Sequence, residues 1–254
     1  MTIFTKKKVV EEIQSDQLVR VASTYFPDVE LSDSYIWDNV RAAEAEIEQD
    51  LRVFLEPVVV LPESVKQSEK DALDAAGTRW IEAPGYDWEP EFFRGNAWGY
   101  LIARHSPVIS VDYFKFIYPI SDATVFEVPT SWIRIDKKYG HIRILPSGTL
   151  LSAPLNSYIM SVVGGGRTVP HVLMLKYTAG IKDVRKDYPN LVKVIKKLAV
   201  LKIIEDEFQP SSQSISADGL TQSMSVDTSK YEENIEKTLK KLREEIHGVR
   251  MMAV

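Results

Sequence analysis

The sequence predicts an α+β fold: a helical bundle, built from an N-terminal helix and two C-terminal helices, that carries an antiparallel β-rich insertion lobe. Apolar side chains recur at helical spacing in two long segments, residues 31–57 and 187–208. Strand-like sequence, rich in β-branched and aromatic residues, fills the stretch from about residue 100 to 178 between them. Because the order is helix, strands, helices, we expect the helices to pack together and the sheet to form a lobe set into them.

The clearest N-terminal helix is predicted over "LSDSYIWDNVRAAEAEIEQDLRVFLEP", with Ser32 or Asp33 as its cap and Pro57 at its end. Its core-facing stripe has apolar residues at steps of three or four: Ile36, Val40, Ala43, Ile47, Leu51 and Leu55. Four carboxylates between them are expected to stay largely in water: Glu44, Glu46, Glu48 and Asp50.

An earlier helix is expected over residues 6–25, because apolar residues recur there at loosely helical spacing. These residues are Val10, Ile13, Leu18, Val21 and Tyr25. The segment should end before Pro27, since the residue that precedes a proline avoids the helical region.

The insertion lobe is predicted from three strand segments and a hairpin. The strand segments are "PVISVDYFKFIY", "NSYIMSVVGGG" and "PHVLMLKYTAG". The hairpin, "SWIRIDKKYGHIRIL", places Ile133, Ile135, Ile142 and Ile144 on one face and Arg134 and Arg143 on the other. The segment before the strands, "EAPGYDWEPEFFRGNAWG", is expected to be an ordered loop, because its large aromatic side chains need burial. Residues 62–76 read as a short helical or irregular stretch.

Two helices follow the lobe. In "DYPNLVKVIKKLAVLKIIEDEF", Pro189 suits the first turn and Asp187 is the predicted cap. In "TSKYEENIEKTLKKLREEIHG", Ser229 and Glu232 have the spacing of a capping box, and Gly248 suits the C-terminal end. We therefore expect three regions. They are residues 1–84 as the N-terminal helical part, 85–178 as the strand-rich lobe, and 179–254 as the C-terminal helices with a polar hairpin arm at 214–227.

Composition excludes several classes of protein. The chain has 254 residues, a formal net charge of −5 and no cysteine, so disulfides, Cys-based metal sites and thiol catalysis are all excluded. The acidic balance argues against a dedicated nucleic-acid binder. No apolar window approaches the length of a membrane span, and no apolar region follows the basic N-terminal residues as in a signal peptide. We expect a soluble protein made in the cytoplasm, with no membrane partner.

Signs of catalysis are weak. The glycine cluster "VVGGGRTV" lacks the phosphate-loop pattern and a following helix, and no GxSxG elbow is present. The histidines are scattered and none has helical metal-ligand spacing: His105, His141, His171 and His247. The sequence therefore predicts no catalytic residue, no metal and no cofactor. An enzyme with an unrecognised site stays as an alternative.

Two segments are too small to be stable alone and favour a partner. The first, "SISADGLTQSMSVD", combines a turn with alternating long side chains, and a lone two-stranded hairpin is marginal in water. The second is the apolar stretch after Gly248, "VRMMAV". The predicted partner-binding residues are Ile215, Asp218, Leu220, Gln222, Met224, Val226, Val249, Met251, Met252 and Val254. The alternatives are an arm folded back on its own domain and a frayed tail.

The order of segments resembles the head–tail connector (adaptor) proteins of tailed bacteriophages. The similarity lies in the acidic helix "SDSYIWDNVRAAEAEIEQDL" with "LEPVVVLPE", and in "RHSPVISVDYFKFIY" and "WIRIDKKYGHIRI". It continues in "LKYTAGI" before the "DYPNLVKVIKKLAVLKIIEDEF" helix, and in "SADGLTQSMS" before a closing charged helix. It covers roughly residues 30–247.

The resemblance implies a structural virion protein of the neck, the head–tail interface, and not an enzyme. Such adaptors form a homo-oligomeric ring, commonly a dodecamer, that binds the portal protein and the tail, stopper or other neck proteins. Double-stranded DNA passes through the ring non-specifically. The extended arm and the tail would bind the neighbouring subunit or the portal. This chain departs from the smallest members by its long strand-rich insertion, and another neck, tail-completion or baseplate protein is the main alternative.

Overall fold

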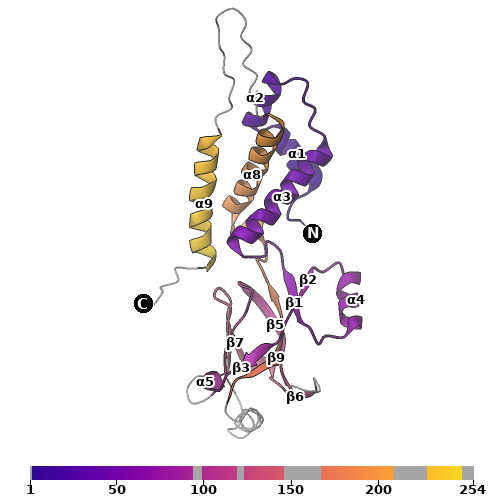
Figure 1. The fold of residues 1–254 in the computed structure, drawn as a ribbon, viewed down its shortest axis with the longest axis vertical. Helices are drawn as coiled ribbons and strands as arrows, with labels where there is room; N and C mark the ends of the chain where they lie inside the picture. Colours follow the sequence, from indigo (N-terminus) through magenta and orange to yellow (C-terminus); the bar gives the residue numbers. More distant parts are fainter. Residues whose placement is uncertain (1, 94–98, 119–122, 146–166, 209–227, 248–254) are drawn as a thin grey trace, which may run out of the picture. The chain divides into compact units, whose positions relative to one another are not determined.

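The computed structural model describes residues 2–93, 99–118, 123–145, 167–208 and 228–247. The chain folds into two compact units. The helical unit comprises residues 1–52 and 183–245, and the sheet unit comprises 53–182 together with 246–254. Figure 1 colours the helical unit from both ends of the chain, because its helices come from the N-terminal and the C-terminal parts of the sequence.

The helical unit is built around two long helices. α3 (Asp33–Leu51) and α8 (Pro189–Glu207) lie side by side and make the most extensive helix–helix contact of the described residues (Figure 1). The remaining helices of the unit are α1 (Lys6–Gln14), α2 (Gln17–Tyr25), α7 (Val184–Asp187) and α9 (Ser229–His247). The stripe predicted for α3 is buried at Ile36, Val40, Ala43, Ile47 and Leu51, so helices from both ends of the chain share one core.

The first predicted helix is wrong in one respect, because residues 6–25 form two helices. Asp16 adopts extended backbone between them, and its carboxylate accepts a hydrogen bond from the backbone N–H of Leu18 at 2.9 Å. A side chain that caps a helix in this way starts a new helix at that point. Val21 and Tyr25, which the single-helix pattern placed toward the core, are 40% and 55% exposed.

Two predicted boundaries of the long helices also differ. α3 ends at Leu51, before Pro57, because Arg52 takes the left-handed conformation at φ 52° and ψ 43°. The residue before α8 is Tyr188, whereas Asp187 ends α7. The cap predicted for α3 is confirmed at Ser32, whose hydroxyl accepts a hydrogen bond from the Tyr35 N–H at 3.2 Å.

α9 begins with contacts made by Thr228. The Thr228 hydroxyl donates to the Glu232 carboxylate at 2.7 Å, and the Thr228 carbonyl accepts from the backbone N–H groups of Tyr231 and Glu232. The apolar side chains of Ile235, Leu242 and Ile246 on α9 are buried. Gly248, the predicted end of this helix, lies outside the described residues.

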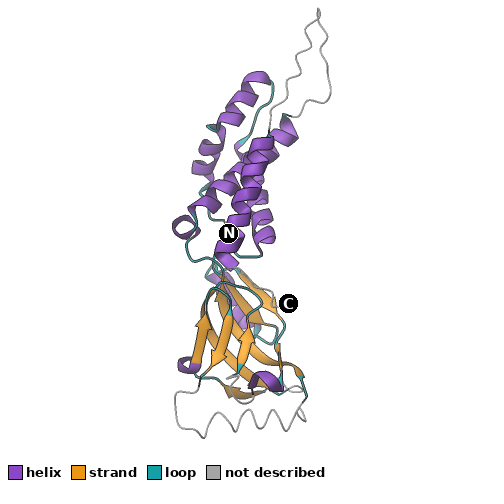
Figure 2. Cartoon of the chain, turned by 90° about the vertical axis from the view of Figure 1, so that its left-hand side faces the viewer, coloured by secondary structure: helices purple, strands orange, loops and turns teal. Residues whose placement is uncertain are grey.

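The sheet unit contains a larger mixed sheet and a smaller antiparallel one (Figure 2). Within the described residues the larger sheet has the order β2-β1-β9-β5-β6, with β3 also paired to β9. Its strands are β1 (Val58–Pro62), β2 (Trp80–Ala83), β3 (Tyr86–Trp88), β5 (Val108–Ile117), β6 (Thr124–Glu127) and β9 (Val169–Ala179). β1 and β2 are parallel and are joined through α4 (Gln67–Ala75), because parallel neighbours need a crossover.

The smaller sheet contains the predicted hairpin, which is confirmed. β7 (Ile133–Asp136) and β8 (His141–Ile144) pair with Ile133 opposite Ile144 and Ile135 opposite Ile142, while Arg134 faces Arg143. β4 (Tyr100–Ile102) pairs with the other edge of β8, and η2 (Thr130–Trp132) leads into β7. The α+β prediction is thus confirmed, with one parallel strand pair that the antiparallel description lacked.

The loop predicted before the strands is only partly irregular. Trp88 is 1% exposed at the end of β3, and Phe93 ends the short helix α5 (Pro90–Phe93) and stacks on it with ring centroids 6.1 Å apart. Phe92 is 40% exposed, so one of the aromatic side chains expected to be buried faces solvent. Residues 53–84 belong to the sheet unit because β1 and β2 are strands of its larger sheet, whereas the sequence pattern suggests a boundary at 84/85.

Candidate functional site

The predicted partner-binding residues lie outside the described residues. These are Ile215, Asp218, Leu220, Gln222, Met224, Val226, Val249, Met251, Met252 and Val254. The strand predicted over "NSYIMSVVGGG" and the glycines of 164–166 lie outside them as well. The arm and the tail therefore stay predictions, and the site described below comes from other residues.

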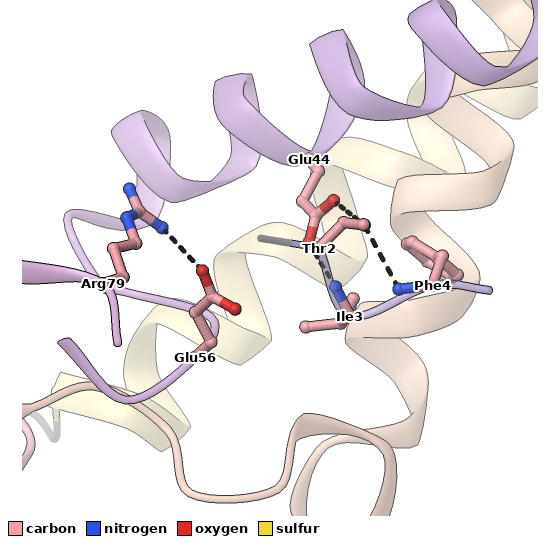
Figure 3. A network of polar contacts seen from close by, with 6 residues as sticks. All are labelled: Thr2, Ile3, Phe4, Glu44, Glu56 and Arg79. Carbon is pink, nitrogen blue, oxygen red and sulfur yellow. Dashed lines mark hydrogen bonds and ion pairs between the residues drawn. The ribbon is translucent and has the colours of Figure 1, made fainter. Parts of the chain in front are cut away.

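The helical unit holds its own N-terminal segment with a buried carboxylate. Glu44 of α3 is 8% exposed and accepts a hydrogen bond from the Thr2 hydroxyl at 2.5 Å and one from the Ile3 backbone N–H at 2.9 Å (Figure 3). The expectation that Glu44 stays in water is wrong, because the chain before α1 covers it. A buried carboxylate is tolerated when such donors satisfy it.

Arg185, in the C-terminal half of the chain, also binds this N-terminal segment. The Arg185 guanidinium donates to the Ile3 carbonyl through Nε at 3.1 Å and Nη2 at 2.9 Å. The adjacent Phe4 is 7% exposed, and the charged groups of Arg185 and Lys196 lie 5.9 and 6.0 Å from its ring centroid. The N–H and the carbonyl of Ile3 are therefore both bound by side chains distant in sequence.

A pocket of about 270 Å³ lies beside Phe4 and Arg185, within the helical unit. Four cations line it: Lys8, Arg185, Lys193 and Lys196. Four apolar residues line it as well: Phe4, Val9, Pro189 and Val192. Glu12 supplies the one carboxylate among the lining residues of the described chain, and it pairs with Lys196 at 2.5 Å. We call this feature the cationic pocket.

The cationic pocket carries excess positive charge. Lys8 and Lys193 are exposed and make no ion pair within the described ranges. Arg185 binds a neutral carbonyl, so its charge is not neutralised by the hydrogen bonds to Ile3. In a chain whose formal net charge is −5, this is a local reversal of sign, and local charge of this kind selects partners.

The sheet unit contains a buried polar network around Tyr177, which is fully buried. The His105 backbone N–H donates to the Tyr177 hydroxyl at 3.2 Å, and the Arg104 N–H donates to the Tyr86 hydroxyl at 3.0 Å. The Arg104 guanidinium lies 4.2 Å from the Tyr86 ring centroid and donates to the carbonyls of Pro84 and Gly85. These contacts fix the turn that leads into β5.

The pKa shifts in this network follow from burial. Burial raises the pKa of Tyr177, and the neighbouring Tyr86 adds to the effect. Burial lowers the pKa of His105, and the Arg104 charge lowers it further. The His105 ring lies 4.9 Å from the Phe54 ring. A neutral histidine packed against an aromatic ring serves as a packing element of the sheet unit.

A charged cluster lies on β5, β9 and α4 of the sheet unit. Lys176 pairs with Glu69 and, at 3.7 Å, with Asp112. Burial raises the pKa of Tyr113 to about 12, and the carboxylates of Glu69, Asp112 and Glu127 contribute. Elsewhere in this unit Arg79 donates to Glu56 at 3.5 Å (Figure 3). The cluster joins α4 to the sheet, which is a structural role.

Metal ligation finds no support in the described residues. They contain no group of three histidine, aspartate or glutamate side chains that could hold an ion. The His171 ring Nδ1 lies 3.1 Å from the Gly85 carbonyl, and the His141 ring lies 5.3 Å from the Tyr100 ring. In the same residues, no helix combines the length and the apolar character needed to cross a bilayer.

Sequence reasoning missed both Glu44 and the cationic pocket. Glu44 lies among other carboxylates on an amphipathic helix, and periodicity alone assigns it to the solvent face. The pocket joins Lys8 of α1 to Arg185 and Lys193, which lie far along the chain. The sequence carries one signal, the basic run "TKKK" beside the buried Phe4, but spacing alone does not connect it to the lysines of α8.

Comparison with known proteins gives matches to solved structures at low sequence identity. No family model and no curated protein matches the chain. A solved chain described as the virion of a native gene transfer agent (GTA) particle is 14% identical with a TM-score of 0.40, over 95% of this chain and 94% of that one. A chain from the neck of an empty GTA particle, computed with C6 symmetry, is 14% identical with a TM-score of 0.39, over 89% and 83%. At these values the likeness identifies neither a family nor an activity for this chain.

Proposed function

We propose that this chain is a structural protein of the neck of a phage-like virion, where identical copies form a ring between portal and tail. The observation that carries the proposal is the assembly of the helical unit from both ends of the chain. α1, α2 and α3 pack with α8, and the sheet unit is inserted in the sequence between α3 and α7. The order of elements in the sequence predicts this arrangement, and the resemblance to head–tail connector proteins rests on the same order of segments.

A ring of identical copies places requirements on the surface of the chain. It repeats one heterologous contact, so each copy needs two different and complementary patches. The helical unit offers the cationic pocket as one such patch. The arm at 214–227 and the tail at 249–254 are the further partner-binding segments of the proposal, with the neighbouring copy and the portal as their partners.

The charge of the chain suits a channel through which DNA passes. A protein with formal net charge −5 repels phosphate on average, and duplex DNA then slides past without being held. α3 contributes the exposed carboxylates of Asp33, Asp38, Glu46 and Asp50 and the single exposed cation Arg41 to its solvent face. The proposed lumen contact with DNA is non-specific.

Another neck, tail-completion or baseplate protein is the second candidate, because it would share the same sheet and helix composition. The two candidates differ in what they bind. An adaptor binds the portal and forms a closed ring, whereas a tail-completion or baseplate protein binds the tail tube or the distal end of the tail.

Immunogold labelling of purified particles tests the proposal. Antibody raised against this chain should label one position, the junction of head and tail. Label at the distal end of the tail would favour the second candidate. If mass spectrometry finds no copy of the chain in particles purified from cells that express it, the proposal is wrong.

A further inference from the structure

We propose that the cationic pocket of one copy binds the acidic segment Glu89–Phe93 of a second copy. The inference rests on the proposed ring, because it names the two complementary patches that a heterologous contact needs. The two patches belong to different units of the chain: the pocket to the helical unit and the acidic segment, which contains α5, to the sheet unit.

The size of the cationic pocket indicates what it can hold. Its volume of about 270 Å³ lies below the usual range of small-molecule and cofactor sites, which starts at about 300 Å³. A pocket of this size accommodates one or two side chains of a protein partner. A peptide segment that inserts a single large side chain therefore suits it better than a cofactor does.

The lining of the pocket selects an occupant that is apolar and acidic at once. Phe4, Val9, Pro189 and Val192 offer apolar contact. Lys8 and Lys193 offer charges that no carboxylate neutralises within the described part of the chain. Nucleic-acid phosphate would satisfy the lysines and leave the apolar lining without a partner, so a carboxylate beside an aromatic or aliphatic side chain is the better match.

The chain carries such a segment on its own surface. Among its described residues, the exposed large apolar side chains are Val21, Tyr25, Phe92, Ile102, Tyr118 and Tyr139. Phe92 is the one that directly adjoins a carboxylate, that of Glu91, and Glu89 lies three residues before it. By contrast, Val21 follows Arg20 and Tyr139 follows Lys138.

Phe92 is also partly held in place for such a contact. Its ring meets the Tyr100 ring edge-on at 5.7 Å, which restrains the side chain while 40% of it remains exposed. A restrained aromatic side chain loses little entropy on binding, which is why such residues serve as anchors at interfaces. Glu91 is exposed beside it and can meet Lys8 or Lys193 of the copy that supplies the pocket.

Site-directed crosslinking tests the contact directly, because the chain has no cysteine of its own. Two single-cysteine variants, Lys193→Cys and Glu91→Cys, are mixed at high protein concentration and in assembled particles, and treated with a short bifunctional maleimide. We expect a covalent dimer in the mixture at a yield several times that of either variant alone. The matched control is Lys241→Cys on α9, an exposed lysine away from the pocket, mixed with Glu91→Cys. Equal yields with Lys193→Cys and with Lys241→Cys, in solution and in particles, would overturn the inference.

A charge exchange provides the second measurement. Lys193→Glu and Glu91→Lys should each weaken self-association in sedimentation velocity by about tenfold, and the double variant should recover most of the loss. Both residues are exposed, and circular dichroism confirms that the variants fold. If the losses of self-association add up in the double variant, the contact is contradicted. Binding of duplex DNA to the wild type that Lys193→Glu abolishes would contradict it as well. If the ring forms but the crosslink does not, this inference is wrong and the proposed function stands. If particles contain no copy of the chain, the proposed function itself is wrong.

Discussion

The backbone N–H of Ile3 donates a hydrogen bond to the Glu44 carboxylate at 2.9 Å, across 41 residues of sequence. The Thr2 hydroxyl completes the contact at 2.5 Å, and Arg185 binds the Ile3 carbonyl from the C-terminal half of the chain. The first residues of the chain thereby connect α3 with the region that precedes α8. This connection places Phe4 in the lining of the cationic pocket, so the pocket depends on it.

Glu44→Ala should destabilise the helical unit by about 1–3 kcal/mol, because the donors of Thr2 and Ile3 lose their acceptor in a buried position. Urea unfolding followed by circular dichroism measures the change. The matched control is Glu46→Ala, two residues further along the same helix. Glu46 pairs with Lys202 at 2.7 Å and is largely solvated, so its loss should amount to about 0–1 kcal/mol. Equal effects of the two substitutions would show that the Glu44 contact contributes no more than a surface ion pair.

Ile142→Ala should destabilise the sheet unit by about 2–5 kcal/mol, because its side chain is fully buried and truncation leaves a cavity. Denaturant unfolding followed by tryptophan fluorescence reports mainly on this unit, which contains Trp80, Trp88 and Trp132, whereas the helical unit contains Trp37. Ile102→Ala is the control on the neighbouring strand β4. Ile102 is 52% exposed and should change stability by less than about 0.5 kcal/mol. A loss at Ile102 as large as at Ile142 would contradict the register of β4, β8 and β7.

Acid should destabilise the sheet unit through His105. Burial and the Arg104 charge lower the pKa of His105 in the folded state below its unfolded value of about 6.5, so the unfolded state binds more protons between the two values. The free energy of unfolding should therefore rise with pH through this window and level off above about pH 6.5. His105→Gln should remove that part of the slope, measured as unfolding free energy from pH 5 to pH 8. The same slope in wild type and variant would contradict the assignment.

The arm at 214–227 should gain protection from hydrogen exchange when the ring or portal complex assembles, because a lone hairpin is marginal in water. Exchange mass spectrometry on the free chain and on the assembly measures it. Equal protection of the arm in both states would count against its role.

Deletion of 249–254 should weaken portal binding and leave the melting temperature of the free chain unchanged, because so short an apolar stretch adds little to a core of its own. Co-sedimentation with the portal and thermal unfolding of the free chain measure the two effects. Undiminished portal binding would end the role proposed for the tail.

The sequence predicts those elements whose pattern is local. The isoleucines of the hairpin alternate around a turn with glycine, and they pair opposite one another, as their prediction on one face requires. The stripe of α3 repeats every three or four residues, and it is buried as predicted. In both cases the spacing of apolar residues within one element is enough to predict which face of that element is buried.

Features that depend on distant residues are not predictable in this way. The carboxylate of Glu44 is buried because residues 2–4 cover it. In the sequence, nothing distinguishes Glu44 from Glu46 and Asp50, which are exposed on the same helix. The run "VVVLP" gives no sign that β1 pairs in parallel with β2, since that pairing requires the crossover through α4. The break at Asp16 depends on a side-chain cap inside an otherwise continuous apolar pattern.

Negative-stain microscopy of the purified chain, alone and mixed with the portal protein from the same genome, tests the proposed role most directly. We expect closed rings of identical copies seated on the portal, with copies of the chain that contact one another around the channel. Portal particles without added density, beside chains that remain monomeric at every concentration, would contradict the proposed role.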